Sequence, residues 1–92
     1  MEQQGIKIAV FGGGSSYTPE LIEGLLARRA SIPLRELALV DIEAGRDKVE
    51  TIAALTRRML DQNGLQAVKV SVHYAPDEAI RGAQFVLTQL RV

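Results

Sequence analysis

The sequence predicts an α/β protein built on a parallel sheet, and two observations carry this prediction. Short apolar runs, typical of buried strands, alternate with longer segments in which apolar residues recur every three or four positions. The first run, at residues 6–11, passes through three glycines directly into a helical pattern. Strands that alternate with helices are joined by right-handed crossovers, which make the strands parallel.

The glycines after the first strand indicate a phosphate-binding turn. Gly12 permits a tight turn, and Gly14 lets the backbone approach a pyrophosphate without a Cβ in the way. The helix that follows brings backbone N–H groups and the positive end of its dipole to the same point, which favours an anion. Tyr17 stands where the G-x-G-x-x-G pattern has its third glycine. A purely structural turn is therefore the alternative to nucleotide binding.

The first helix is expected to begin between Ser16 and Pro19, with Thr18 as its cap. Gly24 interrupts the helix interior at a cost of about 1 kcal/mol relative to alanine. It either allows close helix–strand packing, replacing the missing third glycine, or is simply tolerated.

Residues 31–36 are expected to form a loop before a second buried strand at 37–40, which ends at Asp41. An acid at the tip of the second strand can accept the hydroxyls of an adenosine ribose. Asp41 follows Gly14 by 27 residues, against an expected spacing of about 20 residues, and the loop accounts for the excess. The alternative interpretation makes Asp41 the N-cap of the next helix.

That helix is predicted over residues 43–63, with Gly64 as its stop and Leu65 packing back. Arg46, in its first turn, could reach the adenosine end of a cofactor or remain solvated. The alternating residues 68–73 predict a third strand near the sheet edge, and its His73 is interpreted as structural.

A short helix at 77–82 and a fourth strand at 84–88 complete the pattern. The predicted fold is therefore a Rossmann-like parallel sheet with strand order 3-2-1-4, the truncated N-terminal part of a doubly wound domain that includes residues 1–92. Ligand is expected at the switch point between strands one and four, over residues 12–17 on one side and 88–91 on the other.

Composition excludes several classes of function. The 92 residues carry a formal net charge of zero, so electrostatics favour neither nucleic acid nor an anionic membrane as a partner. No apolar run approaches the roughly 18 residues of a membrane span. The first four residues lack the pattern of a secretory signal, and the chain has no cysteine for a disulfide or a thiolate metal site. A cytoplasmic location is the expectation.

Three stretches, GGGSSYTPELIEGLL, ELALVDI and the closing FVLTQLRV, resemble the start of glycoside hydrolase family 4. This family contains 6-phospho-α- and 6-phospho-β-glucosidases. The resemblance implies bound NAD that oxidises the 3-hydroxyl of a sugar, and a divalent metal, usually manganese, that stabilises the enediolate. A base then removes the proton at C2, elimination releases the aglycone, water adds, and the ketone is reduced again. The implied substrate is a phosphorylated disaccharide or glycoside.

The resemblance also implies roles for particular residues. The ribose acid of the family matches Asp41, and the segment beside the nicotinamide matches Gln89 and Arg91. The family's phosphate-binding turn matches Gly12, Gly13, Gly14, Ser15, Ser16 and Tyr17. Its metal ligands and catalytic residues have no counterpart before Val92, so this chain is expected to be an N-terminal NAD-binding segment with no catalytic or metal-binding residue of its own.

Other functions stay open on the residues alone. A 2-hydroxy-acid dehydrogenase would share the fold and the cofactor, whereas a non-enzymatic NAD-sensing module would need no catalytic group. A methyltransferase would also place an acid after the second strand. The charge of Asp41 would repel a 2′-phosphate and so predicts NAD rather than NADP. The exposed fourth strand must be covered by something, and a homo-oligomer is the expectation.

Overall fold

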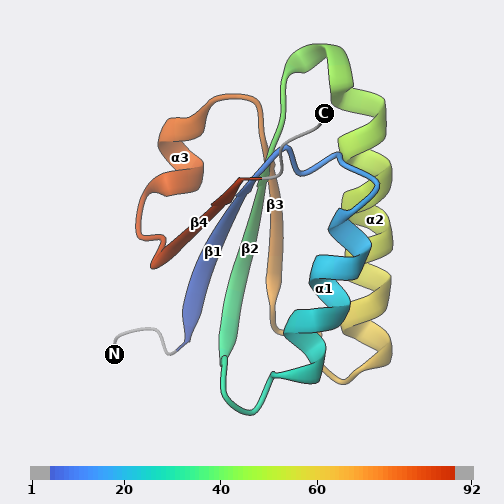
Figure 1. Cartoon of the computed structure of the whole chain (residues 1–92), viewed down its shortest axis with the longest axis vertical. Coiled ribbons are helices and arrows are strands. Elements are labelled where there is room, and N and C mark those ends of the chain that lie inside the picture. Colours follow the sequence, from blue (N-terminus) through green and yellow to red (C-terminus); the bar gives the residue numbers. More distant parts are fainter. Residues whose placement is uncertain (1–4, 89–92) are drawn as a thin grey trace.

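The computed structural model describes residues 5–88, and its centre is a four-stranded parallel sheet. The strands are β1 (Ile6–Phe11), β2 (Leu34–Val40), β3 (Lys69–His73) and β4 (Phe85–Thr88). They lie in the order β3-β2-β1-β4, and every neighbouring pair is parallel (Figure 1). The predicted class of fold and strand order are confirmed.

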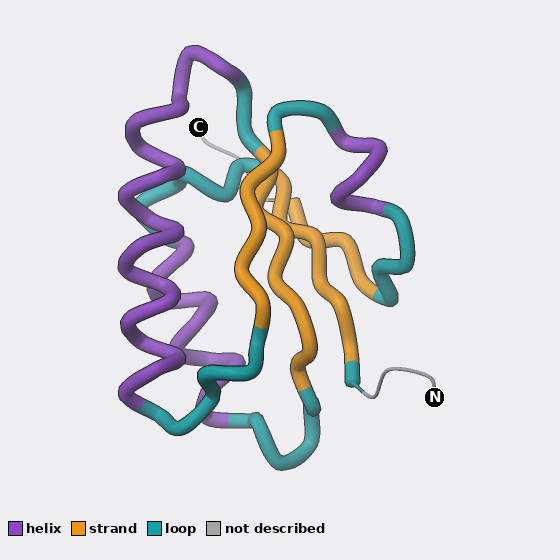
Figure 2. The backbone as a smooth tube through the Cα atoms, turned by 180° about the vertical axis from the view of Figure 1, so that it is seen from behind, coloured by secondary structure: helices purple, strands orange, loops and turns teal. Residues whose placement is uncertain are grey.

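Helices cover the sheet unequally. The helices α1 (Thr18–Ala27) and α2 (Arg46–Gln62) lie together on one face, and the short helix α3 (Pro76–Ile80) lies on the other (Figures 1 and 2). A turn of 3-10 helix, η1 (Glu43–Gly45), precedes α2. None of the helices formed by residues 5–88 has the length and apolar character required to cross a bilayer.

The two faces of the sheet carry different cores because side chains alternate along a strand. The face under α1 and α2 has large aliphatic side chains, such as Ile8 and Val10, packed on Ile22. The opposite face has alanines, such as Ala9 and Ala38, which leave room for α3 to approach the sheet. More apolar surface is therefore buried between the sheet and helices α1 and α2, and most of the hydrophobic stabilisation comes from that face.

A buried lysine holds α3 on its face of the sheet. The Nζ of Lys7 donates to the carbonyl oxygens of Glu78 at 3.0 Å and Arg81 at 2.7 Å, and lies 4.0 Å from Oε2 of Glu36. The side chain of Gln84 also accepts a hydrogen bond from the Lys7 amide at 2.8 Å. The end of α3 and the start of β4 are thus attached to β1 through polar contacts. These contacts of Lys7 were not predicted from the sequence.

Several predicted boundaries were wrong. β2 begins at Leu34 rather than at residue 37, because Leu34 already pairs with Ile6 at the start of β1. Residues 43–63 do not form one helix, since a separate turn of 3-10 helix precedes α2. The predicted stop is confirmed: Gly64 has φ +74°, and the Leu65 amide donates back to the Leu60 carbonyl at 2.9 Å.

Two expectations about α1 were also tested. Thr18 is not the cap, because Tyr17 occupies the N-cap position and the Thr18 hydroxyl donates to the Gly13 carbonyl at 3.0 Å. Gly24 does not permit close packing, because a Cβ placed there meets nothing within 4 Å. The tolerated-glycine interpretation of Gly24 is therefore the correct one.

Candidate functional site

The glycine-rich turn lies where β1 ends, at the carboxyl edge of the sheet, and is fastened to the end of β2. The amides of Gly12 and Gly13 both donate to the carbonyl oxygen of Val40, at 2.8 and 2.9 Å. Gly12 has φ +79°, the left-handed conformation that a residue with a Cβ rarely adopts. The predicted role of Gly12 in a tight turn is confirmed.

Asp41 lies at the tip of β2, directly beside this turn. Its Oδ2 accepts a hydrogen bond from the Gly14 amide at 2.8 Å, and its Oδ1 accepts one from the Ile42 amide at 2.8 Å. The residue is half-buried and forms no ion pair with any residue in the range 5–88. A carboxylate oxygen has two lone-pair sites, so both oxygens of Asp41 can accept a further hydrogen bond from a ligand.

The alternative role of Asp41 as a helix cap is wrong. The N-cap of α2 is Gly45, that of η1 is Ile42, and neither helix start has a side-chain cap. The Asp41 carboxylate instead joins the end of β2 to the glycine-rich turn.

Two glycines of the turn are required by packing within the chain itself. A Cβ on Gly13 would lie 2.7 Å from the Cβ of Leu39. A Cβ on Gly14 would lie 2.7 Å from Oδ2 of Asp41 and 3.2 Å from the backbone nitrogen of Val49. The approach of a pyrophosphate was the only reason expected for Gly14, whereas the structure adds close contact with the Asp41 side chain after β2 and with the backbone of α2.

Most amides of the turn are already occupied. The Ser15 amide donates to the Gly12 carbonyl at 2.9 Å, and the Tyr17 amide donates to the Ser15 hydroxyl at 3.1 Å. Thr18 donates its amide to the Ser15 carbonyl at 3.0 Å. Only Ser16, among residues 12–18, has an amide without an acceptor in the part of the chain that the structure describes, and its side chain is exposed. A bound anion would therefore meet the amide and hydroxyl of Ser16 first.

Arg46 is held by neighbouring side chains at the same edge of the sheet. Its Nη2 donates to Oε1 of Glu43 at 2.6 Å, and its guanidinium stacks 4.5 Å from the centroid of the Tyr74 ring. The hydrogen bond from Arg46 to Glu43 raises the pKa of Arg46, and partial burial raises the pKa of Tyr74, helped by the hydrogen bond that Tyr74 donates to Glu50. The Arg46 guanidinium therefore contacts Glu43 and Tyr74 rather than the Asp41 carboxylate.

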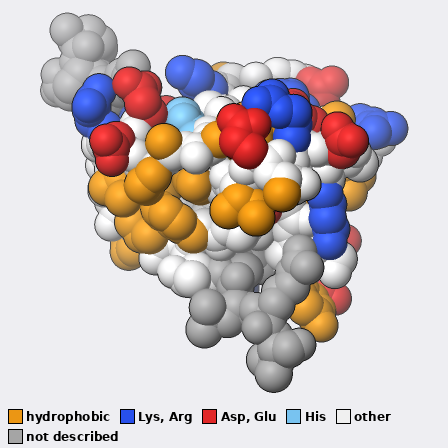
Figure 3. Space-filling view, turned by 90° about the horizontal axis from the view of Figure 1, so that it is seen from above, with side chains coloured by type: hydrophobic (Ala, Val, Ile, Leu, Met, Phe, Trp, Pro, Cys, Tyr) orange, Lys and Arg blue, Asp and Glu red, His pale blue; other side chains and the backbone are white. Residues whose placement is uncertain are grey.

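An exposed isoleucine adds an apolar surface that was not predicted from the sequence. Ile42 follows Asp41 directly and is 68% exposed, although isoleucine is usually buried. The sequence did offer one sign that Ile42 belongs to the site: it directly follows the acid at the tip of the second strand. Figure 3 shows the molecule from the carboxyl edge of the sheet, where hydrophobic side chains lie among acidic and basic ones.

His73, at the end of β3, belongs to a polar cluster on the α3 face. Its Nε2 lies 2.9 Å from the Ser71 hydroxyl, which donates to Oε2 of Glu36 at 3.0 Å. Residues 5–88 contain no group of three His, Cys, Asp or Glu side chains placed to bind a metal ion. The contacts of His73 agree with the structural interpretation.

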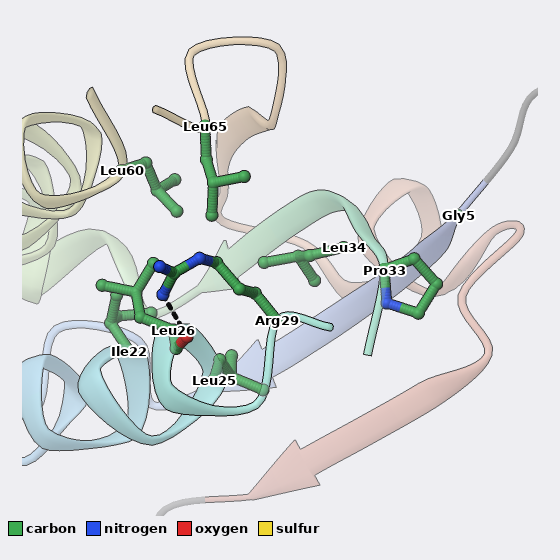
Figure 4. Close-up of a pocket in the computed structure, with 9 residues that line it drawn as sticks. All are labelled: Gly5, Ile22, Leu25, Leu26, Arg29, Pro33, Leu34, Leu60 and Leu65. Atoms are coloured by element: carbon green, nitrogen blue, oxygen red, sulfur yellow. Dashed lines mark hydrogen bonds between the residues drawn. The ribbon is translucent and has the colours of Figure 1, made fainter. Parts of the chain in front are cut away.

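A cavity of about 340 Å³ lies at the opposite end of the sheet (Figure 4). Aliphatic side chains from the end of α1, including Leu25 and Leu26, form its wall together with Leu60 and Leu65, and Arg29 lies beside them with Nη1 donating to the Leu26 carbonyl at 2.7 Å. The cavity contains none of the predicted site residues, so the candidate site is the open edge around Asp41. The remaining predicted residues, Gln89 and Arg91, lie outside the described residues.

Comparison with known proteins gives one consistent result. The probable 6-phospho-beta-glucosidase of Bacillus subtilis (strain 168) is 45% identical over 91 residues, which is 97% of this chain and 20% of the relative. The 6-phospho-beta-glucosidase of Escherichia coli (strain K12) is 46% identical over 89 residues, again 97% of this chain and 20% of the relative. The chain thus spans about one fifth of the length of these relatives.

Comparison with solved structures leads to the same group of enzymes. The 6-phospho-beta glucosidase from Thermotoga maritima, solved with manganese, NAD+ and glucose-6-phosphate, superposes with a TM-score of 0.80 at 32% identity. The match covers 94% of this chain and 20% of that one. Residues 7–92 match the family described as family 4 glycosyl hydrolase. This chain therefore belongs to family 4 of the glycosyl hydrolases.

Proposed function

We propose that residues 1–92 are the NAD-binding segment of a longer 6-phospho-β-glucosidase. Support comes from the names of the two relatives that are 45% and 46% identical, and from the NAD+ in the Thermotoga maritima structure. The observation that carries the proposal is the Asp41 carboxylate, which lies at the carboxyl edge of a parallel sheet, 2.8 Å from the amide of a glycine-rich turn. Family membership favours this function over a 2-hydroxy-acid dehydrogenase.

The residues at this edge fit NAD. Both oxygens of Asp41 retain a lone pair for the hydroxyls of the adenosine ribose, and Ser16 offers an amide and a hydroxyl to the pyrophosphate. Ile42 would supply an apolar wall for the adenine ring. The negative charge of Asp41 would repel a 2′-phosphate, so NAD is favoured over NADP.

Bound NAD would accept a hydride from the sugar carbon that bears the 3-hydroxyl and would later return it. The contribution of this chain is to bind the dinucleotide and fix its orientation. The residues present do not fit the divalent metal, since residues 5–88 contain no suitable ligand group, and no step through a metal is assigned to this chain. The phosphorylated glycoside and the metal would be bound by other parts of the longer enzyme.

Calorimetric titration of the chain with NAD and NADP tests the cofactor assignment. We expect NAD to bind more tightly, and Asp41→Asn to weaken NAD binding and reduce the preference over NADP. The matched control is Asp47→Asn, which removes the same negative charge from an exposed residue in the first turn of α2. Equal affinity of the unaltered chain for both cofactors would refute the role of Asp41.

The activity is tested on the longer protein. We expect hydrolysis of a chromogenic 6-phospho-β-glucoside that depends on NAD and manganese, with no oxidation of 2-hydroxy acids. Oxidation of 2-hydroxy acids without glycoside hydrolysis would support the dehydrogenase instead. NAD binding by the chain combined with neither activity in the longer protein would support the sensing module. The cytoplasmic location and the homo-oligomer stay predictions.

A further inference from the structure

We propose that Asp41 is also the positioning residue of the phosphate-binding turn. One carboxylate would then couple the ribose and pyrophosphate halves of the cofactor site. The ligand part of this proposal rests on the proposed function. The hydrogen bond from the Gly14 amide to the Asp41 carboxylate is present in the chain without a ligand, so it can be tested separately from cofactor binding.

The carboxylate is fixed from both sides. Oδ1 accepts the Ile42 amide and Oδ2 accepts the Gly14 amide, each at 2.8 Å. The backbone of Asp41 is anchored as well, because its own amide donates to the His73 carbonyl at 3.1 Å. The orientation of the Asp41 side chain therefore follows from the end of the sheet, which is rigid compared with a surface loop.

The turn depends on this carboxylate at its centre. Gly12 and Gly13 donate to a backbone carbonyl, whereas the Gly14 amide donates to the Asp41 side chain. Gly14 is the last of the three glycines before Ser16, whose amide is available to an anion. A Cβ on Gly14 would lie 2.7 Å from Oδ2, so the absence of a side chain permits the contact. Losing the Asp41 acceptor would release the turn two residues before the Ser16 donor.

The substitution Asp41→Asn distinguishes the effect of positioning the turn from the effect of the negative charge on anion binding. The asparagine side chain has one oxygen and one NH₂ group, so it cannot accept hydrogen bonds from both amides through different atoms. The substitution also removes a negative charge next to the phosphate site. The charge effect alone should strengthen the binding of an anion, whereas the loss of positioning should weaken it. The two explanations therefore predict changes of opposite sign.

The test uses inorganic pyrophosphate, which has no ribose to contact Asp41. We expect Asp41→Asn to weaken pyrophosphate binding on the order of tenfold, the effect of losing one hydrogen bond to a charged group. Asp47→Asn, the matched control, should leave binding unchanged or slightly stronger. Amide hydrogen exchange of the chain without ligand supplies a second measurement. Asp41→Asn should accelerate exchange at Gly14 about tenfold or more, while exchange at Val10 in β1 stays unchanged.

The outcomes separate this inference from the proposed function. Tighter pyrophosphate binding in Asp41→Asn, or faster exchange at Gly14 with unchanged binding, would overturn the positioning role. If the unaltered chain binds neither NAD nor pyrophosphate, the proposed function fails. Unchanged exchange at Gly14 in Asp41→Asn would also overturn the inference, whatever the chain binds.

Discussion

Replacing Lys7 by methionine should destabilise the chain, because the change removes a buried, hydrogen-bonded charge from the sheet. Lys7 lies in β1 with its side chain only 8% exposed, and its Nζ donates to two carbonyls at 3.0 and 2.7 Å. Methionine keeps an unbranched side chain of similar length, so the change removes the ammonium group and leaves only a small void. The carbonyls of Glu78 and Arg81 would lose this donor at the end of α3.

The magnitude follows from these contacts. Removing one partner of a buried ion pair costs about 3–5 kcal/mol, and leaving a buried carbonyl without its donor costs about 1–3 kcal/mol. The longer separation from Glu36, 4.0 Å, indicates that the two carbonyls contribute more than the ion pair. We therefore expect a loss of about 3 kcal/mol in the free energy of unfolding, a large part of the 5–15 kcal/mol typical of a domain.

Urea denaturation followed by circular dichroism measures this loss. The matched control is Lys69→Met, which removes an exposed lysine from β3 and should change the free energy of unfolding by less than about 0.5 kcal/mol. Hydrogen exchange in Lys7→Met should accelerate first in α3 and at the start of β4. A destabilisation below about 1 kcal/mol would show that the Lys7 contacts do not hold α3, and would refute the reasoning.

Four further substitutions test the site and the sheet edge. Gly14→Ala should lower the free energy of unfolding by about 1–3 kcal/mol even without ligand, because its Cβ would lie 2.7 Å from Oδ2 of Asp41. Gly24→Ala, where nothing lies within 4 Å, should raise the free energy by about 0.5–1 kcal/mol, and urea denaturation of both variants decides. Ile42→Ser should weaken NAD binding several-fold in calorimetric titration at an unchanged melting temperature, since Ile42 is 68% exposed. Val86→Cys should form a disulfide-linked dimer under mild oxidation if edge strands of two copies pair, because the chain has no other cysteine.

Controls decide the last two predictions. Thr51→Ser, on the exposed side of α2, should leave NAD binding unaltered, and an equal loss in both variants would contradict the adenine wall. Ala54→Cys places a cysteine on the opposite layer, so equal cross-linking of Val86→Cys and Ala54→Cys would argue against pairing through β4.

Much of the site could be read from local patterns. The apolar run of β1, the glycines and the acid after β2 each depend on a few neighbouring residues, and together they located the carboxyl edge of the sheet. The pattern could not show which donors of the turn remain available. Of the six amides of residues 12–17 that were expected to face a ligand, five donate to acceptors among residues 5–88, and the Ser16 amide is the exception within that range.

The sequence alone determined the alternation of strands and helices, the order of the sheet, the stop at Gly64 and the position of Asp41 at a strand tip. The alternation, the stop and the strand tip follow from periodicity or from the conformation of a single residue, which are local properties. The strand order follows from the right-handed crossover rule and the Rossmann pattern that the alternation matches. Only the tertiary structure decided that Lys7 is buried under α3, that β2 starts early at Leu34, and that Gly14 and Asp41 contact each other across 27 residues. These features depend on which distant backbone atoms meet in space, and they arise only when the crossovers bring β1, β2 and α3 together.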